Sequence, residues 1–129
     1  MTAPRKILVV DDEIGFRQMF TYLLEPLGFE VTCVENGLEA VKKVEEQAYD
    51  LILMDVHMPI LTGPEALKKI KAIRPTQKVA ILSSSSDPEH ICESTSENEG
   101  AIICLYKPLE LDDIQMVLEK ALGKLPKSL

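Results

Sequence analysis

Residues 51–63 read LILMDVHMPILTG, an apolar run that leads directly into an aspartate. Four apolar residues, Leu51 to Met54, precede Asp55. Such a short apolar run is typical of a strand buried on both faces of a parallel sheet. Pro64, directly after the stretch, is well suited to the first turn of a helix. The stretch therefore predicts a buried strand that ends on a carboxylate, followed by a loop and a helix.

Similar apolar runs alternate with segments of helical periodicity on both sides of this stretch. Besides Leu51–Met54, the expected strands are Lys6–Val10, Glu30–Val34, Lys78–Leu82 and Ala101–Leu105. Apolar residues at helical spacing predict helices within Phe16–Leu27, Leu38–Ala48, Ala66–Ile73 and Ile114–Leu122. Pro26 and Gly28 are expected to end the first of these helices. The segment 83–99 is polar, and it predicts only a short or loosely packed helix.

Strands that alternate with helices predict an α/β fold, a (βα)5 doubly wound parallel sheet with helices on both faces. Right-handed crossovers restrict the topology, and the flavodoxin-like strand order 2-1-3-4-5 is the common solution for five strands. We expect a single domain over residues 1–129. Its core is expected to cover residues 5–123, with 124–129 as a tail or the start of a linker.

Composition and charge narrow the function classes. The chain has 14 Lys and Arg residues against 21 Asp and Glu residues, a formal net charge of −7, which argues against direct nucleic-acid binding. No apolar run approaches the ~20 residues of a membrane span, and Ile7–Val10 is too short for the core of a signal peptide. We therefore expect a cytoplasmic protein. Cys33, Cys92 and Cys104 are odd in number and lack C-x-x-C spacing, which predicts free thiols rather than disulfides or a zinc site.

Reactive side chains follow four of the five expected strands. Asp11 and Asp12 follow the first strand and Asp55 the third; Ser83 and Lys107 follow the fourth and fifth. Because the carboxyl ends of parallel strands meet at one edge, Asp55 is expected to face the two neighbouring acids, with a hydroxyl and an ammonium on its other side. Considered one at a time, each of these residues could be an ordinary loop residue, helix cap or surface lysine. Clustered carboxylates repel one another, so one of them should take up a proton or the group should bind a cation. Mg²⁺ fits such a site, because all of the ligands are oxygen atoms.

Four segments, taken together, resemble the receiver domain of bacterial two-component response regulators. They are ILVVDDE (7–13), LILMDVHMPILTG (51–63), VAILSS (79–84) and GAIICLYKP (100–108), and they occur in the family's order and at family-like spacing. The resemblance extends over about residues 6–122. It implies that Asp55 is the phosphoacceptor, and that Ser83 and Lys107 bind the phosphoryl group. A carboxylate beside a metal ion can act as such a nucleophile.

The resemblance also implies a metal site and partners. Mg²⁺ would be bound directly by Asp12, through water by Asp11, and by Asp55 and the backbone carbonyl of His57. The His57 imidazole is expected to be exposed, and Ser85 holds a position that tunes the phosphoryl lifetime in the family. A sensor histidine kinase or phosphotransfer protein would supply the phosphoryl group. Phosphorylation would switch binding to a downstream protein target or an attached output domain, through the segment after the fourth strand and the fifth strand.

The implied protein is a signalling receiver rather than an enzyme, although it assists its own phosphorylation and dephosphorylation. A phosphorylation-dependent homodimer is a further expectation. One position departs from the family pattern: the switch aromatic, three residues before Lys107, is replaced by Cys104. Tyr106 is adjacent to the lysine and is expected to face the opposite side of the sheet from Lys107 and Leu105. Either Tyr106 is an edge packing residue or the switch is rearranged.

Other functions remain as alternatives. One is a phosphorylation-independent docking module on the same fold, suggested by the altered switch position. Another is a magnesium-dependent phosphohydrolase with an aspartate nucleophile, but such enzymes usually place that residue after the first strand with a second Asp two residues on. Here Asp11 and Asp12 are adjacent. A nucleotide-binding Rossmann protein is weaker still, because no glycine-rich loop follows the first strand.

Overall fold

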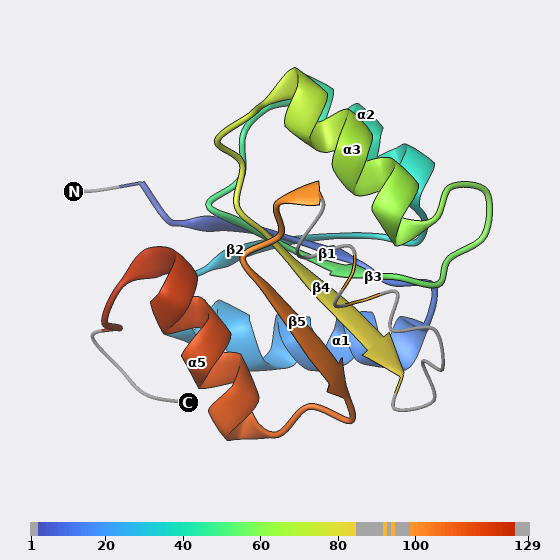
Figure 1. Ribbon diagram of the computed structural model, residues 1–129. Helices are drawn as coiled ribbons and strands as arrows, with labels where there is room; N and C mark the ends of the chain where they lie inside the picture. Colours follow the sequence, from blue (N-terminus) through green and yellow to red (C-terminus); the bar gives the residue numbers. More distant parts are fainter. Residues whose placement is uncertain (1–2, 85–91, 93, 95–98, 126–129) are drawn as a thin grey trace.

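Five parallel strands form one sheet in the order β2-β1-β3-β4-β5 (Figure 1). The computed structural model describes residues 3–84, 92, 94 and 99–125. The strands are β1 (Lys6–Val10), β2 (Glu30–Val34), β3 (Leu51–Asp55), β4 (Val79–Ser84) and β5 (Ile103–Lys107). The helices of the described residues are α1 (Ile14–Leu24), α2 (Gly37–Glu46), α3 (Gly63–Ile73) and α5 (Leu111–Leu122), with a short 3-10 turn at Glu25–Leu27. The predicted α/β fold and strand order are confirmed; most of the segment between β4 and β5 lies outside the described residues.

The helices cover both faces of the sheet. In Figure 1, α2 and α3 lie above the sheet, and α1 and α5 lie below it. Alternate residues of β1 point into the two resulting cores: Leu8 and Val10 pack with α2 and α3, whereas Ile7 and Val9 pack with α1 and α5. Because side chains alternate along a strand, a sheet covered on both faces needs apolar residues at consecutive positions. The continuous apolar runs of the sequence meet this need.

Strands β3, β4 and β5 end later than the apolar runs that predicted them, whereas β1 and β2 have the predicted bounds. Asp55 is the last residue of β3 and pairs with Leu82 of β4. The pairing of β4 with β5 extends to Ser84 opposite Lys107, so β5 lies two residues later than the predicted Ala101–Leu105. Backbone pairing does not require apolar side chains, and the apolar pattern therefore gave the ends of β3, β4 and β5 too early. As a result, Asp55, Ser83 and Lys107 lie on the sheet itself.

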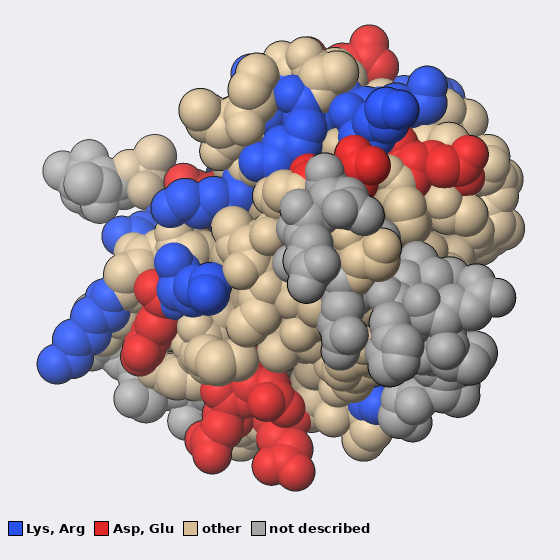
Figure 2. All heavy atoms as spheres, viewed as in Figure 1, with Lys and Arg blue, Asp and Glu red and all other residues tan. Residues whose placement is uncertain are grey.

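Local sequence explains where the helices begin and end. Thr62 forms a capping box with Glu65 at the start of α3, which satisfies two backbone N–H groups, and Pro64 occupies the first turn as predicted. Gly28, with φ of 93°, closes the turn after α1. At the start of α5, acidic side chains gather over the lower end of the helix (Figure 2), where they complement the helix dipole. None of the helices in the described ranges is both long and apolar enough to cross a bilayer.

The prediction of three free thiols is wrong. Cys92 and Cys104 form a disulfide with a Cα–Cα distance of 5.6 Å, and Cys33 alone is free. The sequence spacing was uninformative because a parallel sheet and its connections bring Cys104 of β5 beside Cys92. Cys104 and Tyr106 pack on the α2–α3 side, whereas Leu105 packs on the α1–α5 side. Tyr106 therefore faces away from Leu105, as predicted, and Cys104 ties β5 to the segment that precedes it.

Gly63 is required by a close backbone approach at the end of β3. A Cβ added there would lie 2.5 Å from the Asp55 carbonyl oxygen and 2.8 Å from the Val56 Cα. We expect Gly63→Ala to cost about 2 kcal/mol of unfolding free energy, as overpacking against rigid backbone does. Gly15 is the matched control, because a Cβ added in this helical position meets nothing within 4 Å. Gly15→Ala should stabilise the protein by about 1 kcal/mol. Urea unfolding measures both, and an unaffected Gly63→Ala would contradict the close approach.

The disulfide predicts a redox-dependent stability. Cys92 and Cys104 are 12 positions apart, and closing a loop of this length stabilises a protein by about 3 kcal/mol in the chain-entropy model. We expect dithiothreitol to lower the unfolding midpoint of the wild type but not of Cys104→Ala. Cys33→Ala should keep the full response to reduction. Alkylation of the unreduced, denatured chain should modify one cysteine; three modified cysteines would show that the bond does not form.

Candidate functional site

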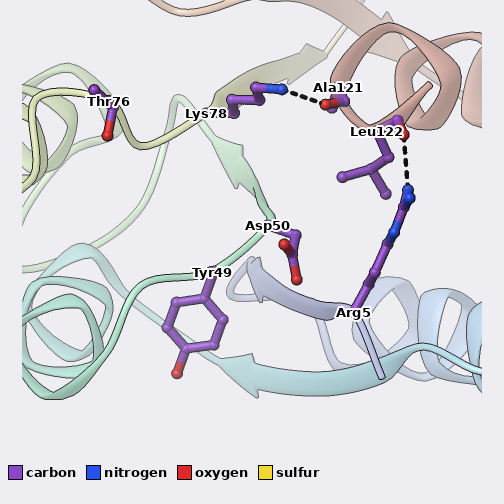
Figure 3. Close-up of a pocket in the computed structure, with 7 residues that line it drawn as sticks. All are labelled: Arg5, Tyr49, Asp50, Thr76, Lys78, Ala121 and Leu122. Atoms are coloured by element: carbon purple, nitrogen blue, oxygen red, sulfur yellow. Dashed lines mark hydrogen bonds between the residues drawn. The ribbon is translucent and has the colours of Figure 1, made fainter. Parts of the chain in front are cut away.

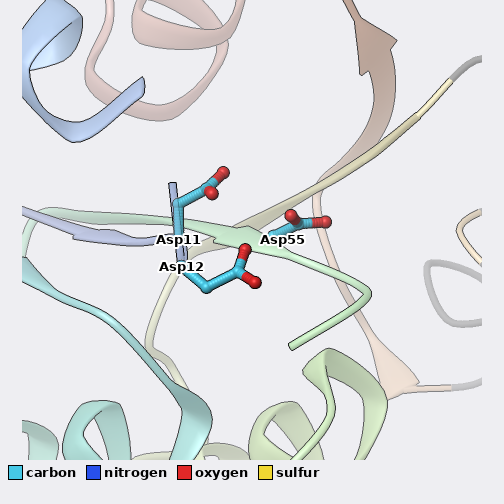
Figure 4. A group of neighbouring side chains, drawn as sticks. All are labelled: Asp11, Asp12 and Asp55. Atoms are coloured by element: carbon cyan, nitrogen blue, oxygen red, sulfur yellow. The ribbon is translucent and has the colours of Figure 1, made fainter. Parts of the chain in front are cut away.

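Three carboxylates converge at the carboxyl edge of the sheet. Asp11 and Asp12 directly follow β1, and Asp55 ends the neighbouring strand β3 (Figure 4). One carboxylate oxygen from each lies within 4.8 Å of the other two. Asp11 and Asp55 are buried, whereas Asp12 is exposed. The cluster is thus an oxygen-rich cup whose base is buried and whose rim is open to water.

Lys107 is the cation that this cluster contacts. Its Nζ donates to Asp11 Oδ2 at 2.7 Å and to Asp55 Oδ2 at 3.1 Å, and it lies 3.5 Å from Glu13 Oε1. The lysine side chain is only 15% exposed. The peptide bond from Lys107 to Pro108 is cis. One ammonium therefore serves several carboxylates, which leaves the group with an excess of negative charge.

The pKa values of Asp11 and Lys107 are both raised, but for different reasons. Burial is the main cause that raises the pKa of Asp11 above its usual value, and the nearby Asp55 charge adds to it; the hydrogen bonds from Lys107 and the Glu13 backbone oppose the shift. For Lys107, burial opposes the charge, but the hydrogen bond to Asp11 and the charge of Asp55 outweigh it and raise the pKa of the lysine. The raised pKa of Asp11 thus reflects mainly its burial, whereas the raised pKa of Lys107 reflects the carboxylates around it.

Backbone and side-chain donors fix the orientation of the two buried acids. Asp11 Oδ1 accepts from the backbone N–H of Glu13 at 2.9 Å, and Asp55 Oδ1 accepts from that of His57 at 3.2 Å. Arg17 of α1 donates to the Asp11 carbonyl at 2.6 Å. Every oxygen of the two carboxylates thus has a donor, but each carboxylate has about four acceptor positions in total. Acceptor capacity therefore remains for a cation.

The loop after β3 has two unusual features beside the site. The imidazole of His57 is exposed, as predicted. Ile60 has φ of 72° and is 74% exposed. A β-branched residue in the left-handed region is a strained conformation. The strain is confined to the short connection between Asp55 and α3, whose start is held against β3 by the close approach of Gly63.

Ser83 is a buried polar side chain without a partner. It follows Leu82, the residue paired with Asp55, on the neighbouring strand β4. Within the part of the chain that the structure describes, its Oγ is buried and makes no hydrogen bond. An unsatisfied buried hydroxyl costs about 1–3 kcal/mol. The Ser83 hydroxyl thus has unused hydrogen-bonding capacity among the described residues, one position after the residue that pairs with Asp55.

The opposite edge of the sheet also carries a pocket, but its cations are already engaged. Lys78 Nζ donates to the Ala121 carbonyl at 2.5 Å, and Arg5 donates to that of Leu122 at 2.8 Å (Figure 3). Both cations thus bind the C-terminal carbonyl groups of α5, where the helix dipole favours positive charge. This pocket anchors a helix end, and the carboxyl edge remains the candidate site.

The structure brings most of the predicted site residues together. Asp11, Asp12 and Asp55 converge, Lys107 contacts Asp11 and Asp55, and Ser83 lies on the adjoining strand. His57 contributes a backbone N–H to Asp55, while its carbonyl remains a predicted ligand. Ser85 lies outside the described residues. Sequence reasoning gave no role to Phe16, whose ring contacts Lys107; its helical spacing marked it only as a core residue.

Comparisons with known proteins agree with this geometry. A sequence model of the response regulator receiver domain matches residues 7–119. The transcriptional regulatory protein ZraR of Escherichia coli is 40% identical over 117 residues, which are 91% of this chain and 26% of that protein. The chain thus spans about a quarter of the length of this relative. The chemotaxis protein CheY of Listeria monocytogenes is 37% identical over 117 residues, 90% of this chain and 97% of that protein.

A solved structure supplies a comparison for the acidic cup. The receiver domain of a sensor histidine kinase from Pseudomonas aeruginosa superposes with a TM-score of 0.79 and 30% identity, over 95% of this chain and all of that one. It was crystallised with a magnesium ion coordinated in its active site cleft. In the present chain, the three converging carboxylates with spare acceptor capacity fit such an ion.

The buried charge of Asp11 is expected to lower the stability of the metal-free protein and to favour metal binding. Since burial raises the pKa of Asp11, its charged form opposes folding at neutral pH, and this cost disappears as the pH falls through the raised pKa. Asp11→Asn should therefore stabilise the metal-free protein at pH 7 by about 1 kcal/mol, as relief of unfavourable charge commonly does. The gain should shrink in acid.

With Mg²⁺ bound, the wild type should become more stable than Asp11→Asn. At ten times its Kd, Mg²⁺ is expected to stabilise the wild type by about 1.4 kcal/mol, and Asp11→Asn by much less at the same concentration. Thermal unfolding at several pH values, with EDTA and with Mg²⁺, measures both effects. Asp50→Asn is the control, since this acid lies at the opposite edge. Equal responses of wild type and Asp11→Asn to Mg²⁺ would contradict the assignment.

Proposed function

Because the chain belongs to the response regulator receiver domain family, we propose that Asp55 accepts a phosphoryl group with the help of Mg²⁺ and that this modification switches partner binding. A sensor histidine kinase or phosphotransfer protein is the proposed donor. The single observation that carries the proposal is the placement of the Ser83 hydroxyl, which has no hydrogen-bond partner among the described residues, on the strand beside Asp55, while Lys107 contacts Asp55 directly. An acceptor carboxylate, a cation and a spare hydroxyl are suited to a phosphoryl group.

The proposed reaction is a transfer to a carboxylate oxygen. An oxygen of Asp55 forms a bond to phosphorus, and the phosphorus–nitrogen bond of the donor histidine breaks. The backbone N–H of His57 and the Lys107 ammonium fix the direction of the carboxylate before the transfer. The Lys107 ammonium then donates to phosphoryl oxygens instead of carboxylate oxygens, and the Ser83 hydroxyl donates to a different phosphoryl oxygen. Both steps use groups already at the edge of the sheet, which lowers the cost of orientation.

The residues proposed to hold the metal are Asp12 directly, Asp11 through water, Asp55 and the backbone carbonyl of His57. When bound, Mg²⁺ supplies positive charge that offsets the charge of the carboxylates and of the phosphoryl oxygens. The exposed Asp12 leaves room for the water ligands that Mg²⁺ usually retains. Arg17 supports this arrangement from α1, because its hydrogen bond holds the backbone at Asp11.

Phosphorylation is proposed to act by a population shift. Recruiting Ser83 to the phosphoryl group would favour a state in which the end of β4 and the following segment are drawn towards Asp55. Output would pass through this segment and β5 to a downstream target or an attached output domain, or through a homodimer. We place the activity in the cytoplasm, where histidine kinases present their donor domains, and we assign no direct nucleic-acid binding to this domain.

A phosphorylation-independent docking module is the second candidate. The disulfide of Cys104 favours it, because this residue replaces the switch aromatic and ties β5 to the preceding segment. In a docking module, partner affinity would be the same for wild type and Asp55→Asn. In a phosphoryl-accepting receiver, affinity would change after phosphorylation of the wild type only.

Intact-mass spectrometry after incubation with a small acyl phosphate tests the principal proposal. We expect one added phosphoryl group on the wild type in Mg²⁺ and none in EDTA. Asp55→Asn should take up no phosphoryl group, while Asp50→Asn, at the opposite edge, should react as the wild type does. Labelling that persists in Asp55→Asn, or no labelling of the wild type by several donors, would contradict the assignment.

Ser83→Ala tests the role of the hydroxyl in a binding measurement. Loss of a hydrogen bond to a charged group costs about 1.5–3 kcal/mol, so the affinity for beryllium fluoride, a phosphoryl mimic, should fall by at least about tenfold. The unmodified variant should be as stable as the wild type or more stable, because an unpartnered buried hydroxyl has been removed. An unchanged affinity would show that Ser83 does not contact the phosphoryl position.

A further inference from the structure

The ammonium of Lys107 lies against an aromatic ring. Its Nζ is 4.2 Å from the centroid of the Phe16 ring, inside the range of about 6 Å over which cation–π attraction acts. Lys107 ends β5, and Phe16 belongs to the first turn of α1. The contact therefore joins the active lysine to an element that supplies none of the proposed ligands.

The Phe16 ring is itself fixed by the core. It packs edge-on against Phe20, with centroids 5.0 Å apart and an interplanar angle of 67°. Phe20 is fully buried, and it lies one helical turn further along α1. Residues four positions apart on a helix are neighbours on one face. The ring position is thus set by packing, and it does not depend on a bound ligand.

The lysine needs such a fixed neighbour because its oxygen partners compete. Besides Asp11 and Asp55, Glu13 Oε1 lies 3.5 Å from Nζ, and the Glu13 side chain is 70% exposed. A lysine has a flexible four-carbon stem, so Glu13 can draw the ammonium outward from the buried acids. The ring face attracts the cation through its quadrupole, from a position set by packing rather than by an exposed side chain.

We propose that Phe16 is a positioning residue for Lys107: its ring keeps the ammonium between Asp11 and Asp55, ready to contact the oxygens of the transferred phosphoryl group. This inference rests on the proposed function of Asp55. It assigns Phe16 a role in the reaction rate in addition to its role in packing. Without the ring, the ammonium spends more time at Glu13 or in water, and fewer molecules are poised for transfer.

A spectroscopic measurement tests the contact without any reaction. Ring currents should shift the side-chain protons next to the Lys107 ammonium upfield in the NMR spectrum of the unmodified protein. Phe16→Leu keeps an apolar side chain of helical preference and removes the ring, and the shift should disappear. The resonances of Lys78, which is bound to α5 at the opposite edge, should not move. An unchanged Lys107 spectrum in Phe16→Leu would overturn the contact.

A kinetic series tests the positioning role. Mono-, di- and trifluorinated phenylalanine at position 16 withdraw electron density from the ring face in steps while nearly conserving its shape. The rate of phosphorylation at Asp55 should fall in the same steps, by about three- to tenfold in total, as expected for a partly desolvated cation–π contact. Phe16→Leu should fall at the slow end. The same fluorinated residues at position 20, which lies behind Phe16, should leave the rate unchanged, and thermal unfolding of every variant should be recorded.

The outcomes separate the inference from the proposed function. A rate that is independent of fluorination at position 16, in a wild type that labels at Asp55, would overturn the positioning role alone. A rate that follows the unfolding temperatures of both the position 16 and the position 20 series would do the same, because it would indicate packing. Failure of the unmodified protein to label would overturn the proposed function, and with it the reactive role of the contact. A stepwise fall at position 16 only, together with the Lys107 shift, establishes the proposal.

Discussion

The pairing of β1 with β3 is the constraint on which the site depends. Right-handed crossovers place these two strands side by side at the centre of the sheet, with β2 outside β1 and β4 and β5 beyond β3. All five strands are parallel, so the residues at their carboxyl ends share one edge. Acids from two adjacent strands must then lie close together despite their mutual repulsion. The apolar cores on both faces of the sheet stabilise this unfavourable grouping, because their burial does not depend on the charge at the edge.

The charge at this edge is only partly balanced. Lys107 contacts three acids, and the raised pKa of Asp11 shows that burial outweighs the lysine contact. A single lysine is too little to neutralise the acids that it contacts. The remaining negative charge favours a divalent cation, and the raised pKa of Lys107 keeps the ammonium charged. A site with equal numbers of carboxylates and ammonium groups would bind a divalent cation less well.

The sequence predicted the sheet and the four reactive strand ends because both follow from periodicity and connection rules. Asp11 and Asp55 were identified because each directly follows an apolar run, and Lys107 because it lies two residues after one. The ends of β4 and β5 were set too early, because Ser83 and Tyr106 continue the backbone pairing without forming an apolar run, whereas the ends of β1 and β2 were predicted as observed. The Cys92–Cys104 bond was missed because pairing depends on distance in space, which sequence spacing does not give. The contact of Phe16 with Lys107 was missed for the same reason. The helical spacing of Phe16 identifies a core position and carries no information about β5.

Two groups at this edge are each incompletely satisfied, and their needs are complementary. The acids have acceptor capacity for a cation, whereas the Ser83 hydroxyl has a donor without an acceptor within the described residues. A metal ion alone would use the acceptor capacity of the acids, and a phosphoryl group alone would accept the hydrogen bond of Ser83. A phosphoryl group also adds about −1.5 to −2 charge, which the acidic cup tolerates only if cations accompany it. If Asp55 is phosphorylated as proposed, the metal and the lysine are therefore both needed to balance the added charge. In that reaction, a lysine held by a rigid ring would change partners from carboxylate to phosphoryl oxygens without leaving the site.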